Sequence, residues 1–115
     1  KIKKNLDAAI TQANIKNFIR SLPNGINTKI GEFGIRLSGG QSKRVALART
    51  FYHDKEIIVM DEATSSLDEK TENFILEQIK ELKRKKTVII ITHNKNTLKY
   101  CDKVYEIING KIRKK

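Results

Sequence analysis

The run Ile57-Ile58-Val59-Met60-Asp61-Glu62 decides the fold, because four apolar residues lead into two adjacent acids. Its composition predicts a strand over residues 56–61 that is buried on both faces, as in a parallel sheet covered by helices. A second apolar run at 88–91 predicts a similar strand over residues 87–92. A helical stretch separates the two strands. The sequence therefore predicts an α/β fold with parallel central strands.

Hydrophobic spacing and turn residues predict the remaining elements. A helix that starts at Asn5 or Asp7 is expected to reach about Arg20, and a loop is expected over residues 28–36. Asp68 is a candidate N-cap for the helix between the two strands. The other predicted elements are helices at 38–52, 68–85 and 94–100, and a C-terminal β-hairpin of strands 103–108 and 111–113 joined by Asn109-Gly110.

The segment Leu37-Ser38-Gly39-Gly40-Gln41 precedes a predicted helix and has the composition of a phosphate-binding turn. Two glycines lack Cβ atoms, so a phosphate can approach the backbone, and the Ser38 hydroxyl can donate a hydrogen bond. The helix N-terminus adds free N–H groups and a positive dipole end. A flexible loop ahead of any helix is the alternative. The acidic strand end that follows favours the phosphate site.

Three further candidates lie where the predicted strands end. Asp61 is suited to hold Mg²⁺ through water, because Mg²⁺ keeps part of its hydration shell, and Glu62 to orient or deprotonate an attacking water. His93 can donate to a γ-phosphate oxygen. Alternatively, the two acids merely cap a turn and the histidine is structural. Because the carboxyl ends of parallel strands form the usual ligand site of α/β folds, the functional interpretation is favoured.

Together these motifs resemble the later half of the ATP-binding domain of ABC transporters, a partial P-loop NTPase. Residues 37–41 match the signature motif, the strand ending at Asp61 the Walker B motif, and Glu62 the catalytic glutamate. His93 matches the switch histidine. By this resemblance residues 1–52 form the helical and signature region, and residues 53–115 run from Walker B to the hairpin. The D-loop is matched by Ser65, Ser66, Leu67 and Asp68.

The resemblance implies a parent protein whose ATPase drives export or lipid or glycolipid flipping. Residues 18–34 resemble the corresponding segment of ABC exporters. In that group the part that matches residues 28–34 lies near the coupling helices of the transmembrane domains. ATP and Mg²⁺ are the implied cofactors, and a second nucleotide-binding domain in a head-to-tail dimer is the implied partner. Residues 37–41 would then serve the partner's ATP. The implied location is the cytoplasmic face of a bacterial inner membrane.

One expected motif does not occur in the sequence. The phosphate loop G-x-x-x-x-G-K-[ST] (Walker A) is absent from the 115 residues, so this chain alone is predicted to be inactive as an ATPase. Two departures from the family pattern, Ser42-Lys43 after the signature and Asn94 after the switch histidine, are interpreted as tolerated surface variation.

The formal net charge of +11 raises a second class of partner. Basic residues concentrate at 1–4, 80–86 and 111–115 rather than in a stripe interleaved with aromatics, so we interpret them as solvated surface and expect no nucleic acid. Two alternatives stay open. One is a DNA-associated ABC-type ATPase of genome maintenance, although no long coiled coil precedes the signature. The other is a non-catalytic interaction module.

Overall fold

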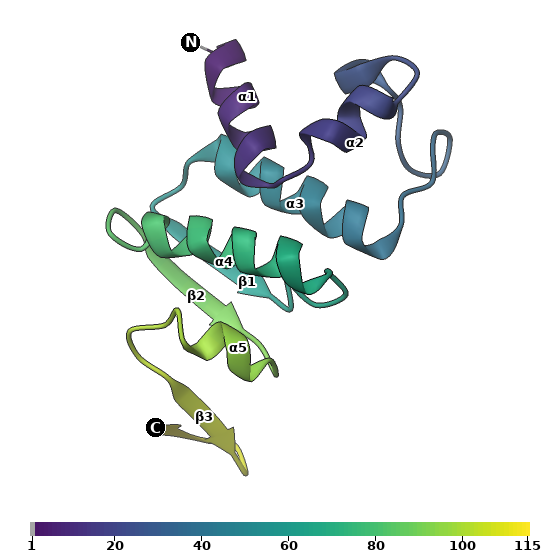
Figure 1. Cartoon of the computed structure of the whole chain (residues 1–115). Helices are drawn as coiled ribbons and strands as arrows, with labels where there is room; N and C mark the ends of the chain where they lie inside the picture. Colours follow the sequence, from purple (N-terminus) through teal and green to yellow (C-terminus); the bar gives the residue numbers. More distant parts are fainter. Residues whose placement is uncertain (1) are drawn as a thin grey trace.

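Two parallel strands and the helix that joins them form the centre of the computed structural model, which describes residues 2–115 (Figure 1). Strand β1 (Ile57–Asp61) pairs with β2 (Thr87–Ile91) in a register that runs from Ile57 opposite Thr87 to Asp61 opposite Ile91. Helix α4 (Glu69–Leu82) connects them. The predicted parallel strand pair is confirmed, and it brings the carboxyl ends of both strands to one edge.

Side-chain caps fix where the two long helices begin. Ser38 caps α3 (Gly39–His53): the Gln41 N–H donates to Ser38 Oγ at 3.2 Å, and the Ser38 N–H donates to Gln41 Oε1 at 2.9 Å. This reciprocal capping box satisfies two backbone donors at once. The Asp68 carboxylate caps α4 by accepting from the Thr71 N–H at 2.9 Å. Both helix starts agree with the sequence prediction.

The predicted single helix reaching Arg20 is wrong, because the chain turns at Asn14. Helix α1 (Ile2–Gln12) ends before it and α2 (Lys16–Ser21) follows it. Asn14 has a left-handed φ of 53°, a conformation that asparagine tolerates better than most residues. Its carbonyl accepts a hydrogen bond from Arg44 Nη1 at 3.0 Å. The break therefore ties α1 and α2 to α3, and the 3₁₀ turn η1 (Gly25–Asn27) comes next.

The hydrophobic core lies between the helices and one face of the strand pair. Helices α1, α3 and α4 each contribute buried side chains, and α1 packs on α3. On the sheet, Ile58 and Met60 of β1 are 3% and 4% exposed. Figure 1 shows α4 lying along β1 and β2, with α1 and α2 beyond α3. The core side chains are Ala9, Ile10, Ala13, Ile15, Leu47, Phe51, Ile58, Met60, Ile75, Leu76 and Ile79.

The other face of the strand pair is open, so the prediction of strands buried on both faces is wrong for this chain. Ile57 and Val59 are each 63% exposed, and Ile89 and Ile91 are about half exposed. The alternation is clear along β1, where Ile58 and Met60 face the helices and their neighbours do not. No element within residues 2–115 covers the outer face.

The C-terminal hairpin forms a separate sheet. Strands β3 (Tyr105–Ile108) and β4 (Lys111–Lys114) pair antiparallel around Asn109-Gly110, and both turn residues have positive φ, as the predicted tight turn requires. Short helix α5 (Lys95–Leu98) precedes the hairpin. The hairpin extends away from the helices (Figure 1), and the radius of gyration is 15.5 Å. A compact domain of this length would have about 13 Å.

The outer edge of β2 is unpaired, since β2 pairs only with β1 among residues 2–115. Unpaired backbone groups on an apolar strand attract another chain. We therefore expect the isolated 115-residue chain either to form a swapped or edge-paired oligomer or to shift its hairpin. Light scattering across a concentration series measures whether the oligomer forms. The variant Ile89→Lys, with Ile107→Lys on the hairpin as its control, should reduce association because an added charge blocks edge pairing. A monomer with strong amide-exchange protection across both 88–91 and 104–108 would contradict this expectation.

Candidate functional site

The ends of β1 and β2 bring Glu62 and His93 into contact. Glu62 Oε1 accepts a hydrogen bond from the His93 backbone N–H at 3.1 Å and lies 3.7 Å from His93 Nε2. The Glu62 side chain is 34% exposed, whereas the imidazole of His93 is 98% exposed. Asp61, the last residue of β1, is exposed beside them. The edge thus carries two carboxylates and an imidazole that are all open to a ligand.

The backbone after β1 holds an uncommon conformation. Glu62 and Ser66 have φ values of 49° and 67°, in the left-handed region that costs a non-glycine residue about 1–3 kcal/mol. Local hydrogen bonds stabilise this turn. The Glu62 N–H donates to the Ile91 carbonyl at 2.9 Å, and the Glu62 carbonyl accepts from Ser65 N–H at 3.2 Å and Ser65 Oγ at 2.9 Å. Such conformations concentrate at functional sites.

The N-terminus of α3 has the donors that a phosphate needs. Gly39 and Gly40 lie in the first helical turn, where N–H groups have no carbonyl partner within the helix. A Cβ built on Gly39 would meet no atom within 4 Å, so the space beside this backbone is open. The Ser38 hydroxyl accepts from Gln41 and keeps its own proton free to donate. Leu37 precedes this turn. These donors fit an anionic group such as a phosphate.

The start of α3 also rests on the loop after β1. A Cβ on Gly40 would lie 3.5 Å from both Leu67 Cδ2 and the Ser66 carbonyl oxygen, which is ordinary contact. Within the described part of the chain, no hydrogen bond joins the side chains of Ser38 or Gln41 to Glu62 or His93. The phosphate-binding turn therefore contacts the loop at 65–68, which follows the strand-end carboxylates. The turn and the carboxylates make no direct polar contact with each other among the described residues.

Lys43 is not tolerated surface variation, contrary to the sequence interpretation. Its side chain is half-buried, and Nζ donates to the Glu62 carbonyl at 2.7 Å and to Ser65 Oγ. Its neighbour Ser42 is exposed. Lys43 thus links α3 directly to the turn that carries Glu62.

Asn94 is exposed, as the sequence interpretation expects, but its side chain also has a defined structural role. Its Oδ1 accepts from the Asn96 N–H at 2.9 Å and caps α5. Its amide Nδ2 donates to Glu72 Oε1 at 2.7 Å. The same carboxylate oxygen accepts from Thr64 Oγ1 at 3.0 Å. Glu72 therefore ties together the loops that follow β1 and β2.

Sequence reasoning missed Glu72, although its spacing carried a signal. It is 9% exposed and lies at helical spacing from the buried residues Ile75, Leu76 and Ile79 of α4. A carboxylate on a buried helix stripe requires polar partners, because burying it without them is costly. That rule could have indicated a polar contact beneath the strand ends.

The carboxylates at this edge differ in what they can bind. Asp68 is engaged as the α4 cap, and hydrogen bonds from the Thr71 side chain and backbone lower the pKa of its carboxyl. The Asp61 side chain is exposed and makes no hydrogen bond or ion pair among the described residues. Residues 2–115 contain no cluster of three acidic, histidine or cysteine side chains that could hold a metal alone. A single free carboxylate suits Mg²⁺, which takes most of its ligands from substrate phosphates and water.

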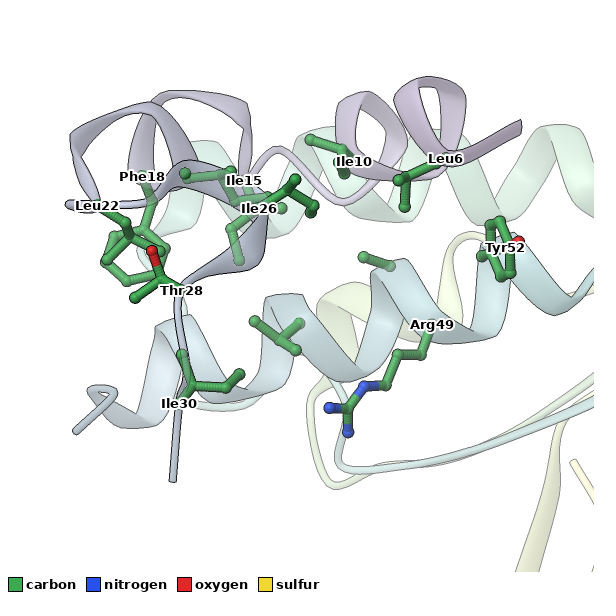
Figure 2. A pocket seen from close by; sticks show the side chains of 14 residues that line it. Leu6, Ile10, Ile15, Phe18, Leu22, Ile26, Thr28, Ile30, Arg49 and Tyr52 are labelled. Carbon is green, nitrogen blue, oxygen red and sulfur yellow. The ribbon is translucent and has the colours of Figure 1, made fainter. Parts of the chain in front are cut away.

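A concavity separate from these residues lies between α3 and the segment that contains α1, α2 and η1 (Figure 2). It has a volume of about 320 Å³ and is lined by residues of α1, α2, η1, the following loop and α3. Arg49 is its only charged lining residue, and most of the others are apolar, including Ile10, Phe18 and Ile26. Thr28 and Ile30 are among its lining residues, so the cavity adjoins the loop at 28–34.

Comparisons with known proteins agree in pointing to one family. The sequence profile described as "ABC transporter" matches residues 1–65. The chain is 39% identical over 110 residues to the ATP-dependent lipid A-core flippase of Pseudoalteromonas translucida, covering 96% of the chain and 19% of that protein. It is 41% identical over 104 residues to a putative multidrug export ATP-binding/permease protein of Staphylococcus aureus, covering 90% of the chain and 18% of that protein.

A solved structure is similar along almost the whole chain. The structure of a bacterial Atm1-family ABC exporter with ATP bound superimposes with a TM-score of 0.84 and 39% sequence identity. The match covers 93% of the chain and 19% of the exporter chain. The chain thus spans about a fifth or less of the relatives that it matches. Within residues 2–115, no helix has the length and apolar character needed to cross a bilayer.

Proposed function

Since the chain belongs to the ABC transporter family, we propose that residues 1–115 are the C-terminal part of the ATP-binding domain, in a protein that hydrolyses ATP to drive export across a membrane. One observation carries the proposal. The Glu62 carboxylate contacts His93 at the edge where β1 and β2 end, next to a helix N-terminus suited to phosphate.

Each residue at this edge has a proposed chemical role. Glu62 orients the attacking water and accepts its proton, and His93 donates to an oxygen of the γ-phosphate. Asp61 holds Mg²⁺ through water. Bound ATP supplies the reacting phosphate, and its Mg²⁺ neutralises charge on the phosphate oxygens. Ser65, Ser66, Leu67 and Asp68 form the D-loop, in which Asp68 is fixed by its cap on α4.

The proposed active unit is a head-to-tail dimer of two nucleotide-binding domains. In this arrangement residues 37–41 of one subunit face the ATP held by its partner, while Glu62 and His93 serve the ATP of their own subunit. The open space beside Gly39 supports this, because among the described residues no atom lies within 4 Å of a Cβ built there. We place the domain at the cytoplasmic face of a bacterial inner membrane, with residues 28–34 toward the transmembrane domains.

The two rival functions have weaker support. In the lysine-rich run at 80–86, Lys80, Lys83, Arg84 and Lys86 all lie within 4 Å of a carboxylate. Such a compensated surface favours solvated side chains over a nucleic-acid groove. A non-catalytic module would have no use for a carboxylate held in a strained turn at the ligand edge.

Reconstituted vesicles provide the test of the proposed function. We expect the full-length protein that contains this chain to hydrolyse ATP with Mg²⁺ and to move a lipid or amphiphile across the vesicle membrane, whereas the 115-residue chain alone shows no saturable hydrolysis. The reason is that positioning of the γ-phosphate requires the phosphate loop. Robust ATPase activity of the isolated chain, or salt-dependent DNA binding by the full-length protein without transport, would refute the proposal.

A further inference from the structure

We propose that Lys43 is a positioning residue that couples the two ATP sites of the dimer, by linking the signature helix to the turn that carries Glu62. The inference rests on the proposed function. It concerns one ammonium group that the roles described above do not use. In one subunit, Lys43 lies on helix α3, whose start is proposed to face the partner's ATP. Its Nζ donates a hydrogen bond to the carbonyl of Glu62, the residue proposed to act on the subunit's own ATP.

The contact itself is specific. Lys43 Nζ donates to the Glu62 carbonyl at 2.7 Å and to Ser65 Oγ, and Ser65 Oγ donates to the same carbonyl at 2.9 Å. The three groups form a closed triangle between segments that are about 20 residues apart in sequence. An ammonium donor makes a stronger hydrogen bond than a neutral donor. The lysine therefore contributes the strongest of the bonds that hold this carbonyl.

The backbone of Glu62 depends on such support. Its φ of 49° lies in the left-handed region, which a glutamate adopts only where surrounding contacts enforce it. The contacts on its carbonyl come from Ser65 and Lys43 alone among the described residues. Loss of the lysine would relax the turn and with it the direction in which the carboxylate points.

The other end of the link is the phosphate-binding turn. Lys43 follows Gly39 by four residues, so it lies one turn into α3 from the free N–H groups. The same helix start contacts Ser66 and Leu67 through Gly40. Gly39 and Lys43 belong to the same continuous helix, so a displacement of its first turn also displaces Lys43. A phosphate that binds at Ser38 to Gly40 thus acts on Glu62 through the lysine.

Lys43 also differs from the other part-buried lysines. Lys83 and Lys86 each form an ion pair at 2.7 Å, with Asp102 and Asp54. No carboxylate lies within ion-pair distance of Lys43 in the described part of the chain, and its partners are a carbonyl and a hydroxyl. The charge is used to fix a backbone group rather than to neutralise an acid.

The test compares Lys43→Met with Lys43→Arg in the full-length ATPase, with the exposed Lys70→Met on α4 as the matched control. We expect Lys43→Met to lower kcat about 10- to 100-fold while KM for ATP changes by less than about threefold, because misplacement of a reacting group affects turnover and not binding. The ATP dependence should also lose its cooperativity. Lys43→Arg should restore part of kcat, and Lys70→Met should match the wild type. Wild-type kcat and cooperativity in Lys43→Met would overturn the inference.

A second measurement keeps the inference separate from the proposed function. In the nucleotide-free full-length ATPase, Lys43→Met should increase amide hydrogen exchange at Glu62 and Ser65 and leave the exchange at the α4 cap, Thr71, unchanged. Unchanged exchange at Glu62 and Ser65 would overturn the inference without any enzymatic assay. If Glu62→Gln abolishes hydrolysis but Lys43→Met does not impair it, only the coupling role fails. If Glu62→Gln has no effect, the proposed function itself fails.

Discussion

A full-length ATPase carrying Glu62→Gln is expected to bind ATP normally and to hydrolyse it at least about 100-fold more slowly than the wild type, the usual scale for loss of a general base. The amide keeps the shape of the side chain. Its oxygen can still accept the hydrogen bond that the His93 backbone N–H donates to Glu62 Oε1 at 3.1 Å in the wild type. It cannot accept the proton of the attacking water. Single-turnover release of phosphate, together with equilibrium binding of ATP, measures both quantities.

The matched control is Glu69→Gln, which removes an exposed carboxylate from the first turn of α4. This control should keep the wild-type rate, because Glu69 lies outside the strand edge. A Glu62→Gln enzyme that turned over as fast as the control would remove Glu62 from its proposed role. Loss of ATP binding in the same variant would show that the carboxylate shapes the site instead of acting on water.

Gly40→Asp should reduce ATP hydrolysis about as strongly as Glu62→Gln does, but by a different mechanism. A Cβ here would lie 3.5 Å from Leu67 Cδ2 and from the Ser66 carbonyl oxygen, which is ordinary van der Waals contact, so Gly40→Ala fits sterically and serves as the control. The aspartate adds a negative charge beside the N–H groups proposed to hold a phosphate, which repels the ligand. We expect a loss of about 10²- to 10³-fold, similar to removal of an essential anion-stabilising donor.

ATP should still bind to the subunit that carries Gly40→Asp, because its own Walker site lies elsewhere. Fluorescent ATP binding measures this occupancy. Equal loss of hydrolysis in Gly40→Ala would attribute the effect to packing against Leu67 and not to charge.

Local sequence signals were sufficient for the elements that position the site. The apolar runs predicted β1 and β2, and parallel pairing then placed Glu62 and His93 at one edge. Ser38 and Asp68 marked the starts of α3 and α4, because a capping side chain acts within three residues of itself. Asn109-Gly110 likewise fixed the hairpin turn.

What the sequence did not predict depends on contacts between distant segments. The break at Asn14 interrupts a plausible helix pattern, and its carbonyl is bound by Arg44, thirty positions further on. The exposure of Ile57 and Ile89 depends on which elements cover the sheet, whereas their apolar character only says that they can be buried. Lys43 and Asn94 looked like surface substitutions because their partners, Glu62 and Glu72, lie about 20 residues away in sequence.

The central claim is that residues 37–41 and Glu62 of one subunit serve two different ATP molecules, and a pair of mixed dimers tests it most directly. One dimer carries Glu62→Gln in one subunit and Gly40→Asp in the other. The second dimer carries both changes in the same subunit, beside a wild-type partner. The two proteins have the same composition and differ only in how the changes are distributed.

In the proposed arrangement, changes on opposite subunits damage the same ATP site and leave the other site complete, whereas both changes on one subunit damage both sites. The account therefore predicts that steady-state ATP hydrolysis persists in the first dimer and falls to background in the second. Activity in the second dimer and none in the first would contradict it, because that pattern requires the signature motif to act on the ATP of its own subunit.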